Sequence, residues 1–309
     1  MNVDGTRNLL HAALKAGIER FVHVSTFSVY GHPPDGDLDE SAPRRTCNDD
    51  YSDSKLEAEN IAFEHVHKFG LPVAIVQPTV VYGPYAPAWT VNVLNRLKSG
   101  RIILVNGGQG LCNAVYVDDV ISGMLSAASR DQAIGEAFLL SAEEPITWRT
   151  FYKRFESFMG GERTVEMTAS EARAYTNQAQ RERTLPRQLV TLLRNHPEVL
   201  TRILGSPEGA ALATLAPPSV ERVGRRIVRG LVAKGPRNSR RKTSSPIQRI
   251  HPLSPWAIRR HESKIRVRID KAKRILDYRP AFDFNRGMDL TEQWARWANL
   301  VESVETVQQ

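Results

Sequence analysis

The strongest constraint on this chain is a tyrosine and a lysine four residues apart, downstream of a strand-like stretch. The stretch Val24-Ser-Thr-Phe-Ser-Val-Tyr-Gly31 precedes the segment Asp50-Tyr-Ser-Asp-Ser-Lys-Leu-Glu-Ala-Glu59. If residues 51–69 form a helix, Tyr51 and Lys55 lie one turn apart on one face. An ammonium close to a phenol favours the phenolate and lowers the pKa of the tyrosine. The pair therefore predicts a tyrosine that moves a proton near neutral pH.

The strand before this helix brings hydroxyl groups to the same place. Residues 20–24 alternate as a buried strand, and Thr26 follows at its carboxyl end. Doubly wound parallel sheets place their sites at that edge, so the hydroxyl of Thr26 or of Ser25 is predicted to hold a substrate oxygen. Two alternatives stay open: a short motif on a surface helix can be incidental, and Thr26 can be a strand-terminal hydroxyl satisfied by backbone.

Helical and strand periods alternate along the chain, which predicts an α/β fold with a parallel sheet. Helices are predicted over 2–16, 51–69, 90–99, 118–129 and from Thr147, and strands over 20–24, 71–76, 101–105, 115–117 and 136–141. We expect a doubly wound, Rossmann-like sheet, incomplete at its N-terminal edge, with a smaller and mostly helical C-terminal region. The predicted domains are 1–160 and 161–309. The stripe of Phe151, Phe155 and Phe158 is interpreted as core.

Six segments match one family in order. They are Met1-Asn-Val-Asp-Gly-Thr6, Val24-Ser-Thr-Phe-Ser-Val-Tyr-Gly31, the Tyr51/Lys55 helix, Val76-Gln-Pro-Thr-Val-Val-Tyr-Gly-Pro84, Asn113-Ala-Val-Tyr-Val-Asp-Asp-Val120 and Asp270-Lys-Ala-Lys-Arg-Ile-Leu-Asp-Tyr-Arg-Pro280. This series closely resembles the extended short-chain dehydrogenase/reductase family, the NAD-dependent epimerase/dehydratase group. The resemblance covers residues 1–160 and again about 262–298.

The resemblance implies roles for individual residues. Tyr51 would be the general acid/base on a substrate hydroxyl or carbonyl, and Lys55 would lower its pKa and hold the nicotinamide ribose. Thr26 would hydrogen-bond the reacting oxygen, with Ser25 as the alternative. The strand end that passes the nicotinamide and the substrate matches Pro78, Thr79 and Val80. His23 and His32 are expected to be structural or exposed.

The resemblance also implies a reaction, a cofactor and an assembly. The reaction would be NAD- or NADP-dependent oxidation–reduction at a secondary alcohol, with a nucleotide sugar as the leading substrate class. The alternatives are a catalytically inactive relative that binds a partner, and a reductase of a non-sugar alcohol or ketone. A homodimer is expected through a four-helix bundle of residues 2–16 and 51–69. The apolar positions expected to serve it are Ala12, Ala13, Leu14, Ile61, Ala62 and Phe63.

Two positions depart from the family pattern. Many sugar-nucleotide members carry an arginine before the strand at 113–117, where it contacts substrate phosphate, and this chain has Cys112. Members acting on flavonoid or steroid-like substrates also lack that arginine. Gln77 stands where arginine is common before the proline.

The family's glycine-rich turn, which places the cofactor pyrophosphate at a helix N-terminus, does not precede the first matched helix. The dense glycine cluster Asn106-Gly-Gly-Gln-Gly110 is interpreted as a loop. We therefore expect that about 90 residues of the dinucleotide-binding domain are missing, at about 30 residues per βαβ unit. On that expectation the 309-residue chain binds NAD(P) weakly.

Composition is typical of a cytoplasmic enzyme. The chain has 309 residues and only two cysteines, Cys47 and Cys112, so a disulfide framework is not expected. No metal-ligand cluster accompanies them, and we predict no metal. No apolar run approaches the length of a membrane span, and the first residues do not resemble a signal peptide.

A basic block lies in the insertion predicted at about 162–261. Residues 221–250 hold ten basic side chains against the single acidic Glu221. The block is predicted as two amphipathic stretches, 189–204 and 220–232, leading into a basic loop at 235–246. A solvated insertion, contact with substrate phosphate and peripheral contact with anionic lipid stay open as interpretations. Nucleic acid is disfavoured because aromatic residues are not interleaved with the basic ones.

Overall fold

A computed structural model describes residues 1–181 and 249–302 of the chain. It divides the chain into two compact units. One contains Met1–Ala172 together with Ser245–Gln309, and the other contains Arg173–Ser244. The stretches predicted at 189–204, 220–232 and 235–246 lie outside the described residues, as does almost all of the basic block. The elements described in the following paragraphs all belong to the first unit.

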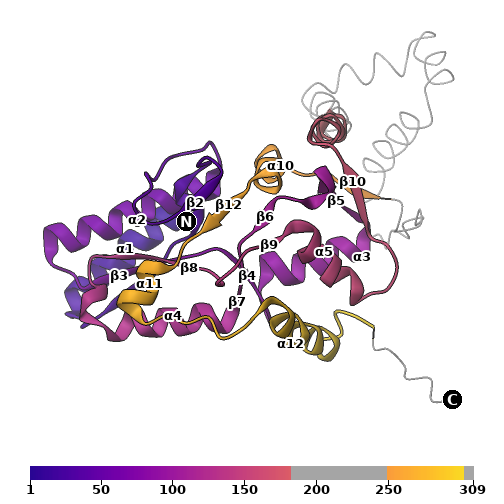
Figure 1. Ribbon diagram of the computed structural model, residues 1–309. Helices are drawn as coiled ribbons and strands as arrows, with labels where there is room; N and C mark the ends of the chain where they lie inside the picture. Colours follow the sequence, from indigo (N-terminus) through magenta and orange to yellow (C-terminus); the bar gives the residue numbers. More distant parts are fainter. Residues whose placement is uncertain (182–248, 303–309) are drawn as a thin grey trace, which may run out of the picture. The chain divides into compact units, whose positions relative to one another are not determined.

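A three-stranded parallel sheet forms the first half of this unit (Figure 1). Its strands are β1 (Phe21–Val24), β3 (Val73–Pro78) and β8 (Ala137–Leu140), in the order β1-β3-β8. All six residues of β3 are buried, as expected for a central strand covered on both faces. Because the strands are parallel, their carboxyl ends meet at one edge.

Helices cover both faces of this sheet. In β3, Val73 and Ile75 pack with α1 (Asn2–Ala16) and α2 (Asp50–Phe69), whereas Ala74 and Val76 pack with the second pair of helices. That second pair is α4 (Val117–Ser129) and α11 (Asp270–Leu276). Alternate residues of a strand point to opposite faces, so the two helix pairs lie on opposite sides. The predicted doubly wound α/β arrangement is confirmed.

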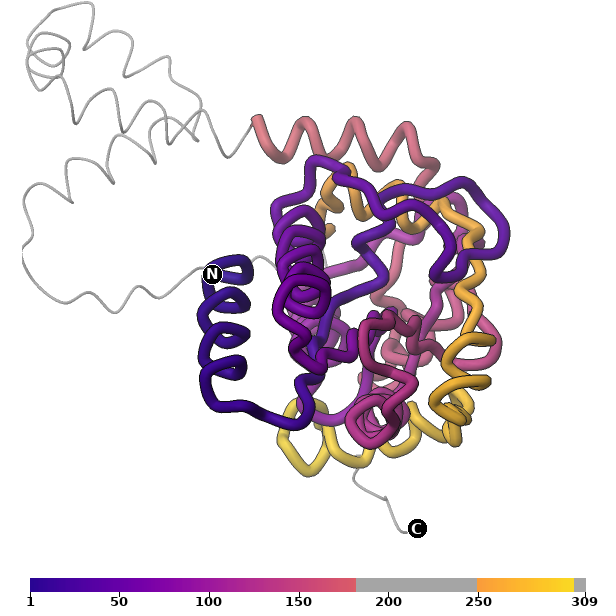
Figure 2. The backbone as a smooth tube through the Cα atoms, turned by 90° about the vertical axis from the view of Figure 1, so that its left-hand side faces the viewer, coloured from indigo at the N-terminus to yellow at the C-terminus, as the bar shows by residue number. Residues whose placement is uncertain are grey.

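Local signals fix the ends of α1 and α2, which lie side by side (Figure 2). Gly17 ends α1 in the left-handed conformation with φ 60°, and Gly70 ends α2 in the same way with φ 66°. These are the positions where glycine costs least. At the start of α2, the Asp49 carboxylate accepts a hydrogen bond from the Ser52 backbone N–H at 3.0 Å.

The packing of α1 on α2 changes the expected dimer surface. Ala13 of α1, and Ile61 and Ala62 of α2, are buried within the chain, with Ala62 at 0% exposure. These three side chains therefore belong to the intramolecular core and are not free for a partner. Leu9, at 62% exposure, and Ala12 lie on the open side of α1.

A second sheet and an aromatic core make up the other half of the unit. Strand β5 (Arg101–Val105) pairs in parallel with β10 (Thr164–Met167) and β11 (Ile250–His251). The helices around it are α3 (Asn92–Ser99), α5 (Trp148–Ser157), α10 (Pro255–Glu262) and α12 (Phe284–Trp297).

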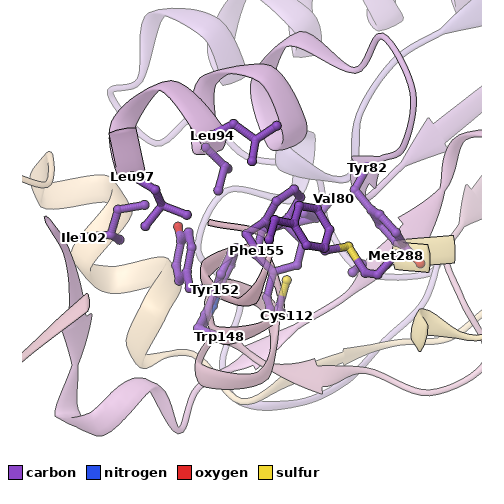
Figure 3. Packing of buried hydrophobic residues seen from close by; sticks show 14 of the residues in the cluster. Val80, Tyr82, Leu94, Leu97, Ile102, Cys112, Trp148, Tyr152, Phe155 and Met288 are labelled. Atoms are coloured by element: carbon purple, nitrogen blue, oxygen red, sulfur yellow. The ribbon is translucent and has the colours of Figure 1, made fainter. Parts of the chain in front are cut away.

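The predicted phenylalanine stripe lies in this core. Phe151, Phe155 and Phe158 are buried together with Trp148 and Tyr152, and Figure 3 shows several of these side chains packed against those of α3 and β5. The interpretation of the stripe as core is confirmed.

Three short strand pairs complete the described fold. They are β2 (Gly36–Leu38) with β12 (Ile265–Val267), β4 (Val80–Tyr82) with β7 (Ala114–Tyr116), and β6 (Leu111–Cys112) with β9 (Ile146–Thr147). The short turns are η1 (Phe27–Tyr30), η2 (Pro87–Val91), η3 (Asn106–Gly108) and η4 (Asp131–Ala133). Strand β2 lies in the region 31–50, which the sequence predicts as loop. The strand was not predicted because its partner β12 is more than two hundred residues away and the local sequence shows no strand pattern.

The glycine cluster at 106–110 serves close packing. Gly108 has φ 71°, and a Cβ there would lie 2.9 Å from the backbone nitrogen of Arg149. A Cβ on Gly110 would lie 2.0 Å from the carbonyl oxygen of His261. The cluster thus lets α5 and α10 approach this segment, and it is the loop that the sequence predicts.

Candidate active site

The site begins where β1 ends. The Ser25 backbone N–H donates to the Val76 carbonyl oxygen at 2.8 Å, so the strand pairing continues one residue beyond β1. Thr26 then caps η1, and its Oγ1 accepts a hydrogen bond from the Ser28 N–H at 3.2 Å. Thr26 is therefore held rigidly at the carboxyl edge of the sheet, with 6% of its surface exposed. The sequence left open that the Thr26 hydroxyl is simply satisfied by the backbone. The bond from the Ser28 N–H is such a contact, and it also fixes the position of the hydroxyl.

Tyr51 lies in the first turn of α2 and meets Thr26. Its side chain is 53% exposed, and the Thr26 side chain lies close enough to act on its pKa. Burial of its inner part raises the pKa of Tyr51, the hydrogen bond with Thr26 opposes the shift, and the nearby Asp49 carboxylate adds to it. The net effect is a raised pKa for the Tyr51 phenol.

Lys55 lies one turn further along α2. Its Nζ donates to the Val24 carbonyl oxygen at 2.7 Å, which ties α2 to the end of β1. Burial lowers the pKa of Lys55, and the Glu59 carboxylate opposes that change. The sequence predicts that this ammonium lowers the pKa of Tyr51. The structure instead shows it on a backbone carbonyl, with the pKa of Tyr51 raised.

The two remaining groups near β1 differ in role. Ser25 is buried, and its Oγ has no hydrogen-bond partner among the described residues, whereas Thr26 contacts Tyr51. The geometry therefore favours Thr26 over Ser25. His23 is 6% exposed, and burial together with Lys55 lowers its pKa to about 4. A neutral buried imidazole agrees with the structural role expected for His23, and His32 is exposed, as expected.

Pro78, Thr79 and Val80 lie at the carboxyl end of β3 and the start of β4, next to the end of β1 in the sheet. All three are buried. Thr79 Oγ1 donates to the Leu140 carbonyl oxygen at 3.3 Å, so it also links β3 to β8. The three residues share the sheet edge with Thr26, which is where the resemblance places the nicotinamide.

A buried polar network behind this edge was not predicted from the sequence. Glu59 of α2 is 0% exposed, and its Oε1 accepts from Arg44 Nη1 at 2.8 Å. Gln77 Nε2 donates to both oxygens of Glu59, at 2.9 and 3.0 Å, and the Tyr30 hydroxyl donates to Gln77 Oε1 at 2.8 Å. Gln77 thus contacts Glu59 from β3, and Arg44 supplies the cation from a loop.

The residues present fit the nicotinamide end of a dinucleotide. An ammonium has three N–H donors, and among the described residues Lys55 makes one hydrogen bond, to Val24. Two donors of Lys55 are thus available for the ribose hydroxyls. Within residues 1–181 and 249–302, three or more metal-ligating side chains do not gather anywhere, and none of the helices there is long and apolar enough to span a membrane.

Comparison with known proteins agrees with the resemblance in the motif series. The family model described as "NAD dependent epimerase/dehydratase family" matches residues 1–140, which are less than half of the chain.

Two curated relatives show the range of the family. The dTDP-D-glucose 4,6-dehydratase of Mus musculus is 33% identical over 135 residues, which are 43% of this chain and 38% of the mouse protein. A ketoreductase of Stigmatella aurantiaca, named for 4-hydroxy-2-methyl-3-oxo-4-farnesyl-3,4-dihydroquinoline-1-oxide, is 33% identical over 153 residues, 48% of this chain and 45% of the relative. The chain thus spans less than half the length of either relative.

Among solved structures, a UDP-glucuronic acid 4-epimerase from Bacillus cereus, in complex with UDP-glucuronic acid and NAD, aligns with a TM-score of 0.58. It is 17% identical, and the alignment covers 96% of this chain and 68% of the epimerase. At this identity the likeness concerns the fold, and it confirms the Rossmann-like α/β expectation.

Proposed function

We propose that the protein catalyses NAD(P)-dependent oxidation–reduction at a secondary alcohol, as epimerases and reductases of its family do. The observation that supports this most is the contact of Tyr51 with Thr26 at the carboxyl edge of the sheet, with Lys55 one turn away on the same helix. A hydroxyl pair and an ammonium at a strand end are the groups needed to hold and protonate one substrate oxygen.

Each of the three side chains has a task. Thr26, fixed by its cap on η1, donates a hydrogen bond to the substrate oxygen. Tyr51 donates its proton to a substrate carbonyl, or accepts one from a hydroxyl in the reverse direction. Lys55 positions the cofactor ribose and favours the phenolate when the proton has left. NAD or NADP, when bound, would supply the hydride acceptor or donor. The raised pKa of Tyr51 keeps the phenol protonated, which suits the carbonyl-reducing direction.

For the substrate we propose a nucleotide sugar. The mouse relative is named for dTDP-D-glucose, and the Bacillus cereus structure holds UDP-glucuronic acid. The ketoreductase among the relatives, together with Cys112 in place of the phosphate-contacting arginine, supports a non-sugar carbonyl as the second candidate. The two candidates differ in whether the substrate carries phosphate.

Replacement of Tyr51 tests the reaction. Tyr51→Phe is expected to lower turnover by about 10²–10⁴-fold, because the proton donor is lost while the ring stays. NAD(P)H absorbance with UDP- and dTDP-sugars, and with aryl ketones, measures it. Tyr85→Phe is the matched control, since Tyr85 is 70% exposed and lies outside the site. Near wild-type turnover in Tyr51→Phe would remove this tyrosine from the mechanism.

We also propose a symmetric homodimer through α1 and α2. With Ala13, Ile61 and Ala62 buried inside the chain, the exposed Leu9 becomes the apolar contact to test. Leu9→Arg is expected to convert a dimer to a monomer in multi-angle light scattering. The control is Leu125→Arg, on the exposed side of α4 at 66% exposure. A wild-type monomer, or a dimer indifferent to Leu9→Arg, would argue against this interface.

A further inference from the structure

The buried network around Glu59 joins the elements that carry the candidate site. Glu59 lies on α2 one turn beyond Lys55, and it is 0% exposed. Gln77, which donates to both oxygens of the Glu59 carboxylate, lies near the carboxyl end of β3. Tyr30, which donates to Gln77, ends η1, the turn that Thr26 caps. One buried carboxylate is therefore connected to each segment that holds a proposed site residue.

The hydrogen bonds of Glu59 suit an ionised carboxylate. Arg44 Nη1 donates to its Oε1 at 2.8 Å, and Gln77 Nε2 donates to Oε1 at 2.9 Å and to Oε2 at 3.0 Å. The Tyr30 hydroxyl donates in the same direction, toward Gln77. An ionised carboxylate only accepts hydrogen bonds, and all of these groups are donors to it or toward it. The chain thus holds a negative charge in its interior, one helical turn from Lys55.

This negative charge acts on Lys55. Burial lowers the pKa of Lys55, and the Glu59 carboxylate opposes that change. Across the helix, His23 of β1 is neutral at pH 7, because burial and Lys55 lower its pKa to about 4. The charged or titratable groups that bear on Lys55 among the described residues are Glu59 and Tyr51 of α2 and His23 of β1, with Arg44 beyond Glu59. Of these, Glu59 is the one that carries negative charge at neutral pH.

We propose that Glu59 is a positioning residue for the reaction, which holds α2 against β3 and η1 and supports the charge of Lys55 from behind. The inference rests on the proposed function, in which Lys55 positions the cofactor ribose and favours the phenolate of Tyr51. A displacement of α2 would separate Tyr51 from Thr26, and a misplacement of about 1 Å can lower a rate by about a hundredfold. Loss of charge on Lys55 would remove its support for the phenolate.

The pH dependence of Lys55 acetylation tests the charge without cofactor or turnover. Only the neutral amine attacks acetic anhydride, so the yield at Lys55, read by peptide mass spectrometry against an internal standard, follows its deprotonation. Glu59→Gln removes the negative charge and is expected to move the curve to lower pH. Arg44→Gln removes the counter-ion, so the Glu59 charge acts more strongly and the curve is expected to move to higher pH. Loss of packing alone would not produce shifts of opposite sign.

Turnover provides the second measurement. Glu59→Gln is expected to lower kcat by roughly tenfold to a hundredfold, because both the position of α2 and the charge of Lys55 change. Glu57→Gln is the matched control, since Glu57 is exposed on the same helix. It is expected to leave both kcat and the acetylation curve of Lys55 unchanged.

The outcomes separate this inference from the proposed reaction. Unmoved acetylation curves in Glu59→Gln and Arg44→Gln, or shifts of the same sign, would overturn the inference, as would a wild-type kcat in Glu59→Gln. If Glu59→Gln fails to fold by circular dichroism, Arg44→Gln decides, and any result other than a shift to higher pH overturns the inference. The expected shifts in a protein without redox activity would reject the proposed function alone. Redox activity with unmoved curves would reject this inference alone.

Discussion

Glu59 and Arg260 are two buried charged side chains of the unit, and they differ in the groups that surround them. Glu59, behind the sheet edge, receives hydrogen bonds from Arg44 and twice from Gln77. Arg260, in the aromatic half, has three indole rings around it but no carboxylate partner among the described residues. One charge is paired through hydrogen bonds, and the other is surrounded mainly by aromatic rings.

The difference separates a charge held by an ion pair from a charge held by aromatic rings. A buried ion that is paired and fully hydrogen-bonded holds neighbouring elements in one arrangement, here α2, β3 and the loop that carries Arg44. A buried guanidinium that is stacked on aromatic rings is held by cation–π contacts instead of an ion pair. By this argument the network of Glu59 supports the candidate site from behind, whereas Arg260 belongs to the aromatic core.

Removing one cation from each region should give the largest contrast. Arg44→Met leaves the carboxylate of Glu59 buried without its counter-ion, and we expect the free energy of unfolding to fall by about 4 kcal/mol. Arg260→Met removes a buried charge that has no counter-ion and loses only ring contacts, so we expect a change within about 1 kcal/mol. Urea unfolding at pH 7 measures both. Equal losses would show that the two charges do not differ in kind.

A second substitution sharpens this contrast. Gln77→Arg in the Arg44→Met background places a cation next to Glu59 from the strand, where resembling proteins commonly have it. We expect it to recover roughly half of the lost stability or more, less the hydrogen bond that Tyr30 donates to Gln77. The same Gln77→Arg change in the wild type puts two guanidinium groups at one carboxylate and is expected to be unfavourable. No recovery would mean that Arg44 acts through the loop and not through its charge.

Much of the first half could be predicted because its signals are local. The period of α2, the cap at Gly70 and the Tyr51/Lys55 spacing lie within twenty residues of each other. The end of β1 follows from the apolar run before Thr26. The motif order resembles the family whose model matches residues 1–140.

What escaped prediction depends on contacts between distant segments. Gln77 was noticed as a departure, but its partner Glu59 is eighteen residues away and Arg44 lies in a loop. Cys112 was also noticed as a departure. Its neighbour Arg260 lies in α10, and the sequence spacing does not reveal that α10 packs near Cys112. Ala62 was expected at a dimer surface but is buried within the chain. The reason is similar, because periodicity shows that a helix face is apolar but does not show which element covers that face.

The pH dependence of stability should show a smaller effect, to which a buried histidine in each region contributes. His23 lies near Lys55, and His261 lies near Arg260 and Arg96, and in both cases burial and the neighbouring cations lower the imidazole pKa. A folded pKa below the unfolded value means that the unfolded state binds the proton more tightly. Stability is therefore full above the unfolded pKa of 6.5 and falls as the pH drops toward about 4 for His23. The loss through His23 is about 3 kcal/mol.

His23→Gln is expected to remove that loss, so its stability should fall less between pH 6.5 and 4 than that of the wild type. His67→Gln, an exposed change on α2, is the control and should follow the wild type. Chemical denaturation at a series of pH values provides the measurement. In His23→Gln the remaining acid sensitivity includes that of His261, whose pKa is lowered by burial and by Arg260 and Arg96. Parallel curves for His23→Gln and the wild type would show that His23 is not the group that titrates.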